Sequence, residues 1–278
     1  MNSPATPAPR PAARARRGTA WVILIACLMW PMAGCGEKKP PKDRFAGQTA
    51  DEIYAIGARQ IERGKYGKAR RTLESALGRA TTTPEIIANV HLGLADAYFL
   101  DGGLLNLAEA LSRYTNFLTF YPNHERADYA QYRLALCYLK QALSPDRDQS
   151  QTRKALAEFM KVSTLYPNSS YVGPAMQKAA EARQRLAESE FRIGRFYFRS
   201  RAWEGAVDRF RAILDDYPLY SGKPRVYLLL GRSLLALDRE DEGNLYLEKV
   251  IAEYPQTTSA YEAEIILQES SGVAEGGP

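Results

Sequence analysis

The sequence has 278 residues, with 37 lysines and arginines against 32 aspartates and glutamates. Four of the arginines lie within the first 17 residues, ahead of an apolar run, and without that segment 33 basic residues face 32 acidic ones. A balance this close to neutrality excludes polyanion binding through overall charge, so we expect no nucleic-acid partner.

Residues 1–34 have the order of a secretory signal. A basic stretch, APRPAARARRG, precedes the apolar run WVILIACLMW, and small residues follow. The apolar run is about ten residues long, whereas a spanning helix needs roughly twenty. The alternative is an uncleaved anchor, which Pro31 and the small Ala33 and Gly34 disfavour. We therefore predict a signal peptide over residues 1–34.

The residues that close this segment, Met32-Ala33-Gly34-Cys35, resemble a bacterial lipobox. That resemblance implies cleavage before Cys35 and acylation of the new N-terminus. Three acyl chains anchor a protein stably, whereas one chain binds a membrane only marginally. Gly36 follows the cysteine where the family uses aspartate to retain lipoproteins at the inner membrane. The expected location is the outer membrane, lipid-anchored and on its periplasmic face.

A polar, proline-containing stretch, GEKKPPKDRFAGQTA, comes next and is too poor in apolar residues to fold alone. We predict a lipidated flexible tether over residues 35–50. From Asp51 onward apolar residues recur at spacings of three and four, as in amphipathic helices, with no alternating strand pattern.

This helical part contains internal repeats. Tyr-Pro closes an amphipathic segment four times, and repeats of about 34 residues with the pattern L-G-x2-Y, A-x3-F and P are typical of tetratricopeptide units. The four pairs are Tyr121-Pro122, Tyr166-Pro167, Tyr217-Pro218 and Tyr254-Pro255. The fold class is therefore expected to be all-α, an α-solenoid of about five such helix pairs.

The unit that fits this pattern best has Ile193-Gly194, Tyr197, Ala206, Phe210 and Pro218. Small residues such as Gly194 and Ala206 let paired helices approach closely, while Phe210 fills the space beside them. We place units 1–3 in residues 51–172 and units 4–5, with a closing helix over about 259–268, in residues 173–270. Residues 271–278 are expected to be a disordered tail.

A stack of such units offers a groove lined by its first helices. At 100° per residue, several apolar positions in the first three units point away from the core-facing side. Exposed aromatic residues in a groove predict a peptide-binding surface, although these side chains could instead pack against the next repeat. The candidates are Tyr54, Leu92, Phe99, Tyr129 and Tyr132.

The chain offers little for catalysis. Neither His91 nor His124 has a partner at metal-ligand spacing, and Cys137, inside YRLALCYLK, is expected to be a buried core residue. Phosphate-binding glycine loops, zinc-protease motifs and nucleophile elbows are missing from the sequence. We expect no enzyme activity, no metal and no cofactor.

The run SPDRDQSQTRKALAEFMKVSTLYPNSSYVGPA, residues 144–175, closely resembles the BamD family, lipoproteins of the outer-membrane β-barrel assembly machinery. Generic repeat lipoproteins share the small residues and the Tyr-Pro ends but lack the RDQ-x-x-TR insertion. The resemblance is strongest from Tyr121 to Pro218 and looser elsewhere.

This resemblance implies a scaffold that binds the channel subunit BamA, other machinery subunits and unfolded β-barrel precursors. In the family the C-terminal units contact BamA, where Arg225 is the matching basic residue. The first three units form a pocket for precursor signals that end in an aromatic residue. The alternative is another repeat lipoprotein, such as a helper of secretin or pilus assembly or a coordinator of the cell envelope.

Overall fold

The structure is a computed structural model that describes residues 43–79 and 82–275, with side chains through residue 270. The chain divides into two compact units, residues 1–46 and 47–278. In the described part of the first unit, the Phe45 N–H donates to the Asp43 carboxylate at 3.0 Å. The predicted signal peptide and Cys35 lie outside the described residues.

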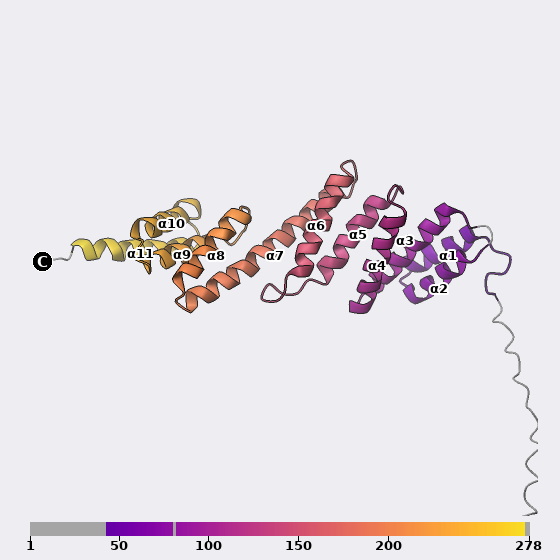
Figure 1. The fold of residues 1–278 in the computed structure, drawn as a ribbon, viewed down its shortest axis with the longest axis horizontal. Coiled ribbons are helices and arrows are strands. Elements are labelled where there is room, and N and C mark those ends of the chain that lie inside the picture. Colours follow the sequence, from indigo (N-terminus) through magenta and orange to yellow (C-terminus); the bar gives the residue numbers. More distant parts are fainter. Residues whose placement is uncertain (1–42, 80–81, 276–278) are drawn as a thin grey trace, which may run out of the picture. The chain divides into compact units, whose positions relative to one another are not determined.

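The second unit is helical throughout its described part (Figure 1). No strand occurs in the residues that the structure describes, and the predicted all-α fold is confirmed. The helices are α1 (Ala50–Glu62), α2 (Tyr66–Leu77), α3 (Pro84–Asp101), α4 (Leu104–Phe120), α5 (Ala127–Lys140), α6 (Ser150–Leu165), α7 (Val172–Arg199), α8 (Trp203–Asp216), α9 (Lys223–Leu235), α10 (Glu240–Glu253) and α11 (Thr258–Glu275).

Each helix packs against its neighbours in sequence, and three pairs of odd-numbered helices also touch, α1 with α3, α7 with α9 and α9 with α11. Five helix pairs, α1–α2 through α9–α10, follow one another, and α11 packs on α9 and α10. The fold is therefore an α-solenoid of tetratricopeptide-like pairs with a closing helix, as the repeats predict.

The Tyr-Pro pairs end helices for a common reason. In α4, α6, α8 and α10 the tyrosine is the C-cap, and its N–H still donates to the carbonyl four residues back, at 2.8 to 3.0 Å. Its own φ is extended, between −128° and −137°, because the residue before a proline is displaced from the helical region. The proline that follows has no N–H and cannot continue the helical hydrogen bonds.

The small residues also have the expected role. A Cβ on Gly194 would lie 2.7 Å from the ring of Phe210, and one on Gly231 would lie 2.9 Å from the Gly243 carbonyl oxygen. Both contacts are shorter than packing allows, so the two helices of these pairs approach at distances that only glycine permits.

Two boundaries differ from expectation. Helix α1 begins at Ala50, with Thr49 and Glu52 forming a reciprocal capping box, so the last residues of the predicted tether are ordered. Helix α11 runs to Glu275 and includes residues 271–275, which were expected in a disordered tail. The Ser270 hydroxyl donates to the Ile266 carbonyl at 2.9 Å, so this serine is accommodated within the helix.

Cys137 is fully buried in the core between α3, α4 and α5, and burial raises the pKa of its thiol to about 12. The prediction of a buried core cysteine is confirmed, and at neutral pH the thiol is protonated. Among the described residues, no helix has both the length and the apolar character required to cross a bilayer.

Candidate functional site

Two of the predicted groove residues, Tyr129 and Tyr132, lie together on α5 and meet Tyr171, which immediately precedes α7. The Tyr171 ring centroid is 5.3 Å from that of Tyr132, nearly parallel to it, and 5.5 Å from that of Tyr129. All three side chains are half-buried. We call these three residues the tyrosine cluster.

The turn that carries Tyr171 is fixed to α5 by hydrogen bonds. The Ser169 hydroxyl donates to an Asp128 carboxylate oxygen at 2.6 Å, and the Tyr171 N–H donates to the Ser169 hydroxyl at 3.0 Å. The third ring of the cluster is therefore held in place by backbone and side-chain contacts together.

Beneath the cluster lies a buried carboxylate, Asp96 of α3. The hydroxyl of Tyr114, fully buried on α4, donates to Asp96 Oδ1 at 2.5 Å, and the Tyr129 hydroxyl donates to the same oxygen at 2.8 Å. The Arg126 guanidinium lies 3.8 Å from the other carboxylate oxygen. Three successive helices, α3, α4 and α5, thus converge on one carboxylate.

Cations on α5 and at its N-cap, Arg126, lie over the neighbouring rings. Arg126, Arg133 and Lys140 are spaced by seven residues, which places them on one helix face. Arg133 lies 4.8 Å from the Phe99 ring centroid and 5.0 Å from that of Tyr129, and its Nε donates to the Tyr129 hydroxyl at 2.8 Å. Arg126 lies 4.9 Å from the Tyr129 ring, and Lys140 lies 5.4 Å from the Phe99 ring. The face combines positive charge with aromatic surface.

Burial sets the protonation of this network. It raises the pKa of Asp96, against the hydrogen bonds from Tyr114 and Tyr129 and the nearby arginines, which lower it. Burial, followed by the Asp96 charge, raises the pKa of both tyrosines well above the ordinary value. The tyrosines therefore remain hydrogen-bond donors across the physiological range.

Two of the predicted groove residues are not on the surface. Leu92 is fully buried and Phe99 is 6 % exposed, and both belong to the core cluster formed by α3, α4 and α5. The prediction that they line an exposed groove is wrong, because the adjacent repeat covers their side of α3. The alternative, packing against the next repeat, holds for these two positions.

Tyr54, the remaining candidate, is half-buried on α1. Its ring packs towards Gly93 of α3, where an added Cβ would lie 3.8 Å from Tyr54 Cε2. Among the described ring contacts, none joins Tyr54 to the tyrosine cluster.

The predicted partner residue Arg225, near the start of α9, has a half-exposed side chain held by α7. Its guanidinium donates to Glu188 at 3.0 Å and to the Tyr220 hydroxyl at 3.1 Å, and it lies 4.6 Å from the Phe191 ring centroid. Tyr220 in turn donates to Glu188 at 2.5 Å. Arg225 is therefore positioned by contacts, with one side of its guanidinium open to solvent.

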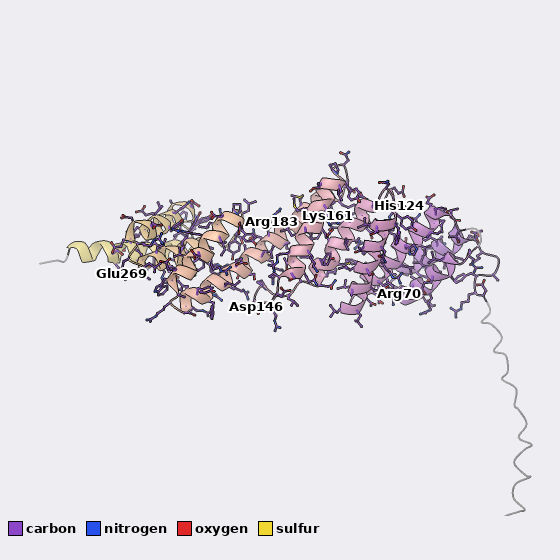
Figure 2. The ribbon with its side chains drawn as sticks, in the orientation of Figure 1. Arg70, His124, Asp146, Lys161, Arg183 and Glu269 are labelled. Carbon is purple, nitrogen blue, oxygen red and sulfur yellow. The ribbon has the colours of Figure 1, made fainter. Side chains whose placement is uncertain are left out.

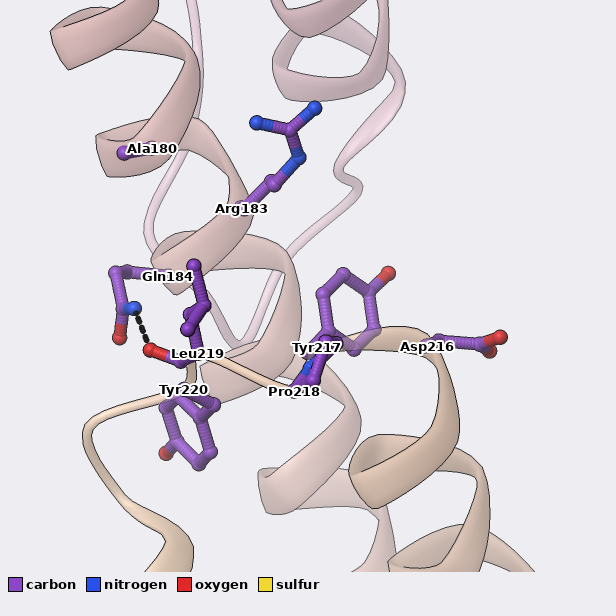
Figure 3. A pocket seen from close by; sticks show the side chains of 8 residues that line it. All are labelled: Ala180, Arg183, Gln184, Asp216, Tyr217, Pro218, Leu219 and Tyr220. Carbon is purple, nitrogen blue, oxygen red and sulfur yellow. Dashed lines mark hydrogen bonds between the residues drawn. The ribbon is translucent and has the colours of Figure 1, made fainter.

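Next to Tyr220 lies a mostly apolar pocket of about 290 Å³ between α7 and the α8–α9 turn (Figure 3). The Gln184 side-chain amide donates to the Leu219 carbonyl at 2.6 Å and fixes this turn, while the Leu219 side chain is 87 % exposed. We call this the Leu219 pocket.

Sequence reasoning missed Leu219, although a comparison of the repeats contains the signal. The residue after each Tyr-Pro is Asn123, Asn168 or Gln256 in the other three turns, and only this turn has an apolar side chain there.

The histidines take structural positions. Nδ1 of His124, labelled in Figure 2, accepts the Arg126 N–H at 3.1 Å just before α5 begins, and the His91 ring stacks 6.3 Å from that of Tyr121. Burial, followed by the Arg113 charge, lowers the pKa of His91. Within residues 43–79 and 82–275, no three side chains of the metal-binding types gather.

Fold and repeats define a tetratricopeptide-repeat protein, and a tetratricopeptide repeat model matches residues 225–257. The family model YfiO, described as outer membrane lipoprotein, matches residues 46–230. Since this match covers most of the chain, the chain belongs to the YfiO family of outer membrane lipoproteins.

Its relatives carry the name outer membrane protein assembly factor BamD. The protein from Caulobacter vibrioides is 28% identical over 221 residues, which are 79% of this chain and 70% of the relative. The protein from Rickettsia prowazekii is 27% identical over 232 residues, 81% of this chain and 88% of the relative. The protein from Vibrio cholerae is 28% identical over 177 residues, 60% and 72% of the two chains.

Among solved structures, the TPR2AB domain of yeast Sti1 in a complex with HSP90 matches with a TM-score of 0.42 and 18% identity. The match covers 81% of this chain and 87% of that domain.

Proposed function

We propose that this protein is an assembly factor for outer membrane proteins, a non-catalytic scaffold that presents unfolded β-barrel precursors to BamA. The observation that carries the proposal is the family match over residues 46–230, together with relatives named outer membrane protein assembly factor BamD. Acyl chains on Cys35 would anchor it at the periplasmic face of the outer membrane and raise its local concentration beside BamA.

The tyrosine cluster is the proposed contact for precursors. Three partly exposed rings, with Arg126 beside Tyr129, offer stacking surface for an aromatic terminal residue and a cation for its carboxylate. Tyrosine and arginine are the residue types that most often dominate binding energy at protein interfaces. Leu92 and Phe99 are excluded from this role by their burial.

Arg225 and the Leu219 pocket form the proposed contact for BamA. An exposed leucine beside an apolar pocket offers an anchor, and the half-exposed guanidinium of Arg225 offers a charged contact at its edge. The two proposed contacts lie in different repeats, which suits a scaffold that holds client and channel at once.

The test uses the full chain and a synthetic peptide that ends in phenylalanine, taken from the C-terminus of an outer-membrane barrel. We expect Tyr132→Ala to weaken binding of this peptide about tenfold, by loss of one aromatic contact. The matched control is Tyr261→Ala, which removes a 66 % exposed tyrosine on α11 and should leave the affinity unchanged. Unchanged affinity in Tyr132→Ala would remove the tyrosine cluster from the proposal.

A second arm of the same experiment uses the last periplasmic domain of BamA as the probe. Leu219→Asn gives this turn the residue found in two other repeats, so the fold should tolerate it. We expect weaker binding of the BamA domain with the peptide affinity unchanged. If wild type and Leu219→Asn bound the BamA domain equally, the BamA contact would lie outside the Leu219 pocket.

A further inference from the structure

The loop between α5 and α6, which ends with the RDQ of the RDQ-x-x-TR insertion, is fixed by hydrogen bonds. Its last residue, Gln149, is the N-cap of α6 and is 3 % exposed, and its side-chain amide donates to the carbonyls of Ser144 at 2.8 Å and Arg147 at 3.0 Å. Its Oε1 accepts the Thr152 hydroxyl at 2.8 Å. The buried glutamine thus adds to the backbone hydrogen bonds of the loop, such as that from the Arg147 N–H to the Ser144 carbonyl at 2.9 Å.

Helix α7 holds this loop from the other side. Arg185 donates to the carbonyls of Ala142 at 3.4 Å and Leu143 at 3.2 Å. Further along α7, Arg192 contacts Asp146, which Figure 2 labels, at 3.2 Å. The loop and the second half of α7 are therefore tied together at two points.

Between them lies a cleft of about 520 Å³, with an apolar and a cationic side. The apolar side contains Phe196, 60 % exposed, and Ile193, 37 % exposed, although both stand on a helix whose other large side chains mostly pack inward. The cationic side contains Arg147 of the loop and Arg195 and Arg199 of α7. We call this the α7 cleft.

Three arginines of the α7 cleft lack ion-pair partners, whereas several charged side chains elsewhere on α7 are paired. Lys178 pairs with Glu181 at 2.7 Å, and Glu190 pairs with Arg209 at 3.4 Å. Within the described part of the chain, Arg147, Arg195 and Arg199 make no ion pair. The one carboxylate of the cleft, Asp146, is already bound to Arg192.

A cation near a helix C-terminus is stabilised by the helix dipole, and this effect alone would explain an unpaired arginine at position 199. It does not explain Arg147, which is on a loop, or the position of Arg195 beside the exposed Phe196. The cleft therefore combines an excess of positive charge with an exposed apolar side.

We propose that the α7 cleft is a docking site for an acidic segment of a partner protein that carries a large apolar side chain. The apolar side chain packs on Phe196 and Ile193, and flanking carboxylates receive hydrogen bonds from Arg147, Arg195 and Arg199. Because the loop is already fixed, binding requires little ordering of this chain. This site is separate from the tyrosine cluster and does not depend on the proposed function.

The test measures binding of a fluorescent hexapeptide, Gly-Asp-Phe-Glu-Leu-Gly, to the full chain in non-ionic detergent by anisotropy. A second peptide has Asn and Gln in place of its acids. We expect the acidic peptide to bind and the amide peptide to bind at least about tenfold more weakly, with affinity falling as salt rises. The double variant Arg195→Gln/Arg199→Gln and the single variant Phe196→Ala should each weaken the acidic peptide about tenfold.

Arg71→Gln is the matched control, since Arg71 is an exposed arginine on α2, outside the cleft. Circular dichroism spectra and melting check that each variant keeps the wild-type fold. Equal affinity for the acidic and amide peptides, or for wild-type and cleft variants, would overturn the proposal. A cleft variant that loses binding to phosphatidylglycerol vesicles but not to the acidic peptide would overturn it in favour of a lipid contact.

Discussion

In the Asp96 network beneath the tyrosine cluster and in the α7 cleft, the same residue types, arginine and aromatic, have opposite surroundings. Arg133 lies over two rings and donates to Tyr129, whose hydroxyl in turn reaches the buried Asp96. Arg195 has no ion pair in the described chain, and its neighbour Phe196 is 60 % exposed. In the Asp96 network the arginines make their contacts within the fold. In the α7 cleft they remain available to bind a partner.

This difference separates stability from binding. A buried network whose members satisfy one another makes three helices interdependent, and its loss should affect folding. An exposed cleft with unpaired cations contributes little to folding, so its loss should affect only association. The tyrosine cluster lies between these extremes, because its rings are partly exposed while the hydroxyl of Tyr129 is already bonded.

The largest expected effect is on stability, from Asp96→Ala. This change leaves the fully buried Tyr114 hydroxyl without its acceptor and removes one acceptor from Tyr129 as well. A buried, unsatisfied polar group costs about 1 to 3 kcal/mol, so we expect a loss of about 3 kcal/mol in the free energy of unfolding. Urea denaturation measures it, and a loss below about 1 kcal/mol would show that the network does not stabilise the fold.

A smaller effect compares one substitution in both regions. Arg133→Gln removes the hydrogen bond to Tyr129 and the cation over Phe99, and should cost about 1 kcal/mol. Arg195→Gln, at an exposed position without an ion pair, should change the free energy of unfolding by less than about 0.5 kcal/mol. Equal losses in the two variants would mean that the regions do not differ as described.

Much of the fold follows from local signals that act within one repeat. Helix ends are set by the Tyr-Pro caps, and close packing within a pair is set by glycines such as those at 57, 194 and 231. Both features depend only on residues of the same repeat, so the spacing of these residues predicts the five helix pairs. The end of α11 is less predictable, because Ser270 is compatible with both a helix and a tail until its hydrogen bond to the Ile266 carbonyl is known.

The candidate site was harder to predict because exposure depends on the next repeat. Counting 100° per residue gives the direction of Leu92 and Phe99 from α3, but not whether α4 and α5 cover that direction. The partners of Tyr129 are 33 residues away in Asp96 and 42 residues away in Tyr171, and no periodicity within one helix reveals such contacts. The α7 cleft likewise joins a loop to a helix about 50 residues further along the chain.

The smallest expected effect is the pH dependence that Asp96 gives to stability. Asp96→Asn keeps an oxygen for the two tyrosines and removes only the titration, so most of the hydrogen-bond energy should remain. In the folded wild type, burial raises the pKa of Asp96 above its ordinary value of 3.8. Between 3.8 and the raised value the folded state therefore binds more protons at this site than the unfolded state does, and the stability from Asp96 is lost as pH rises. The free energy of unfolding of wild type minus that of Asp96→Asn should thus fall in urea titrations as the pH rises above the ordinary pKa of 3.8. A difference that rises with pH would mean that Arg126 and Arg133 outweigh burial, and that the carboxylate is stabilised in its charged form.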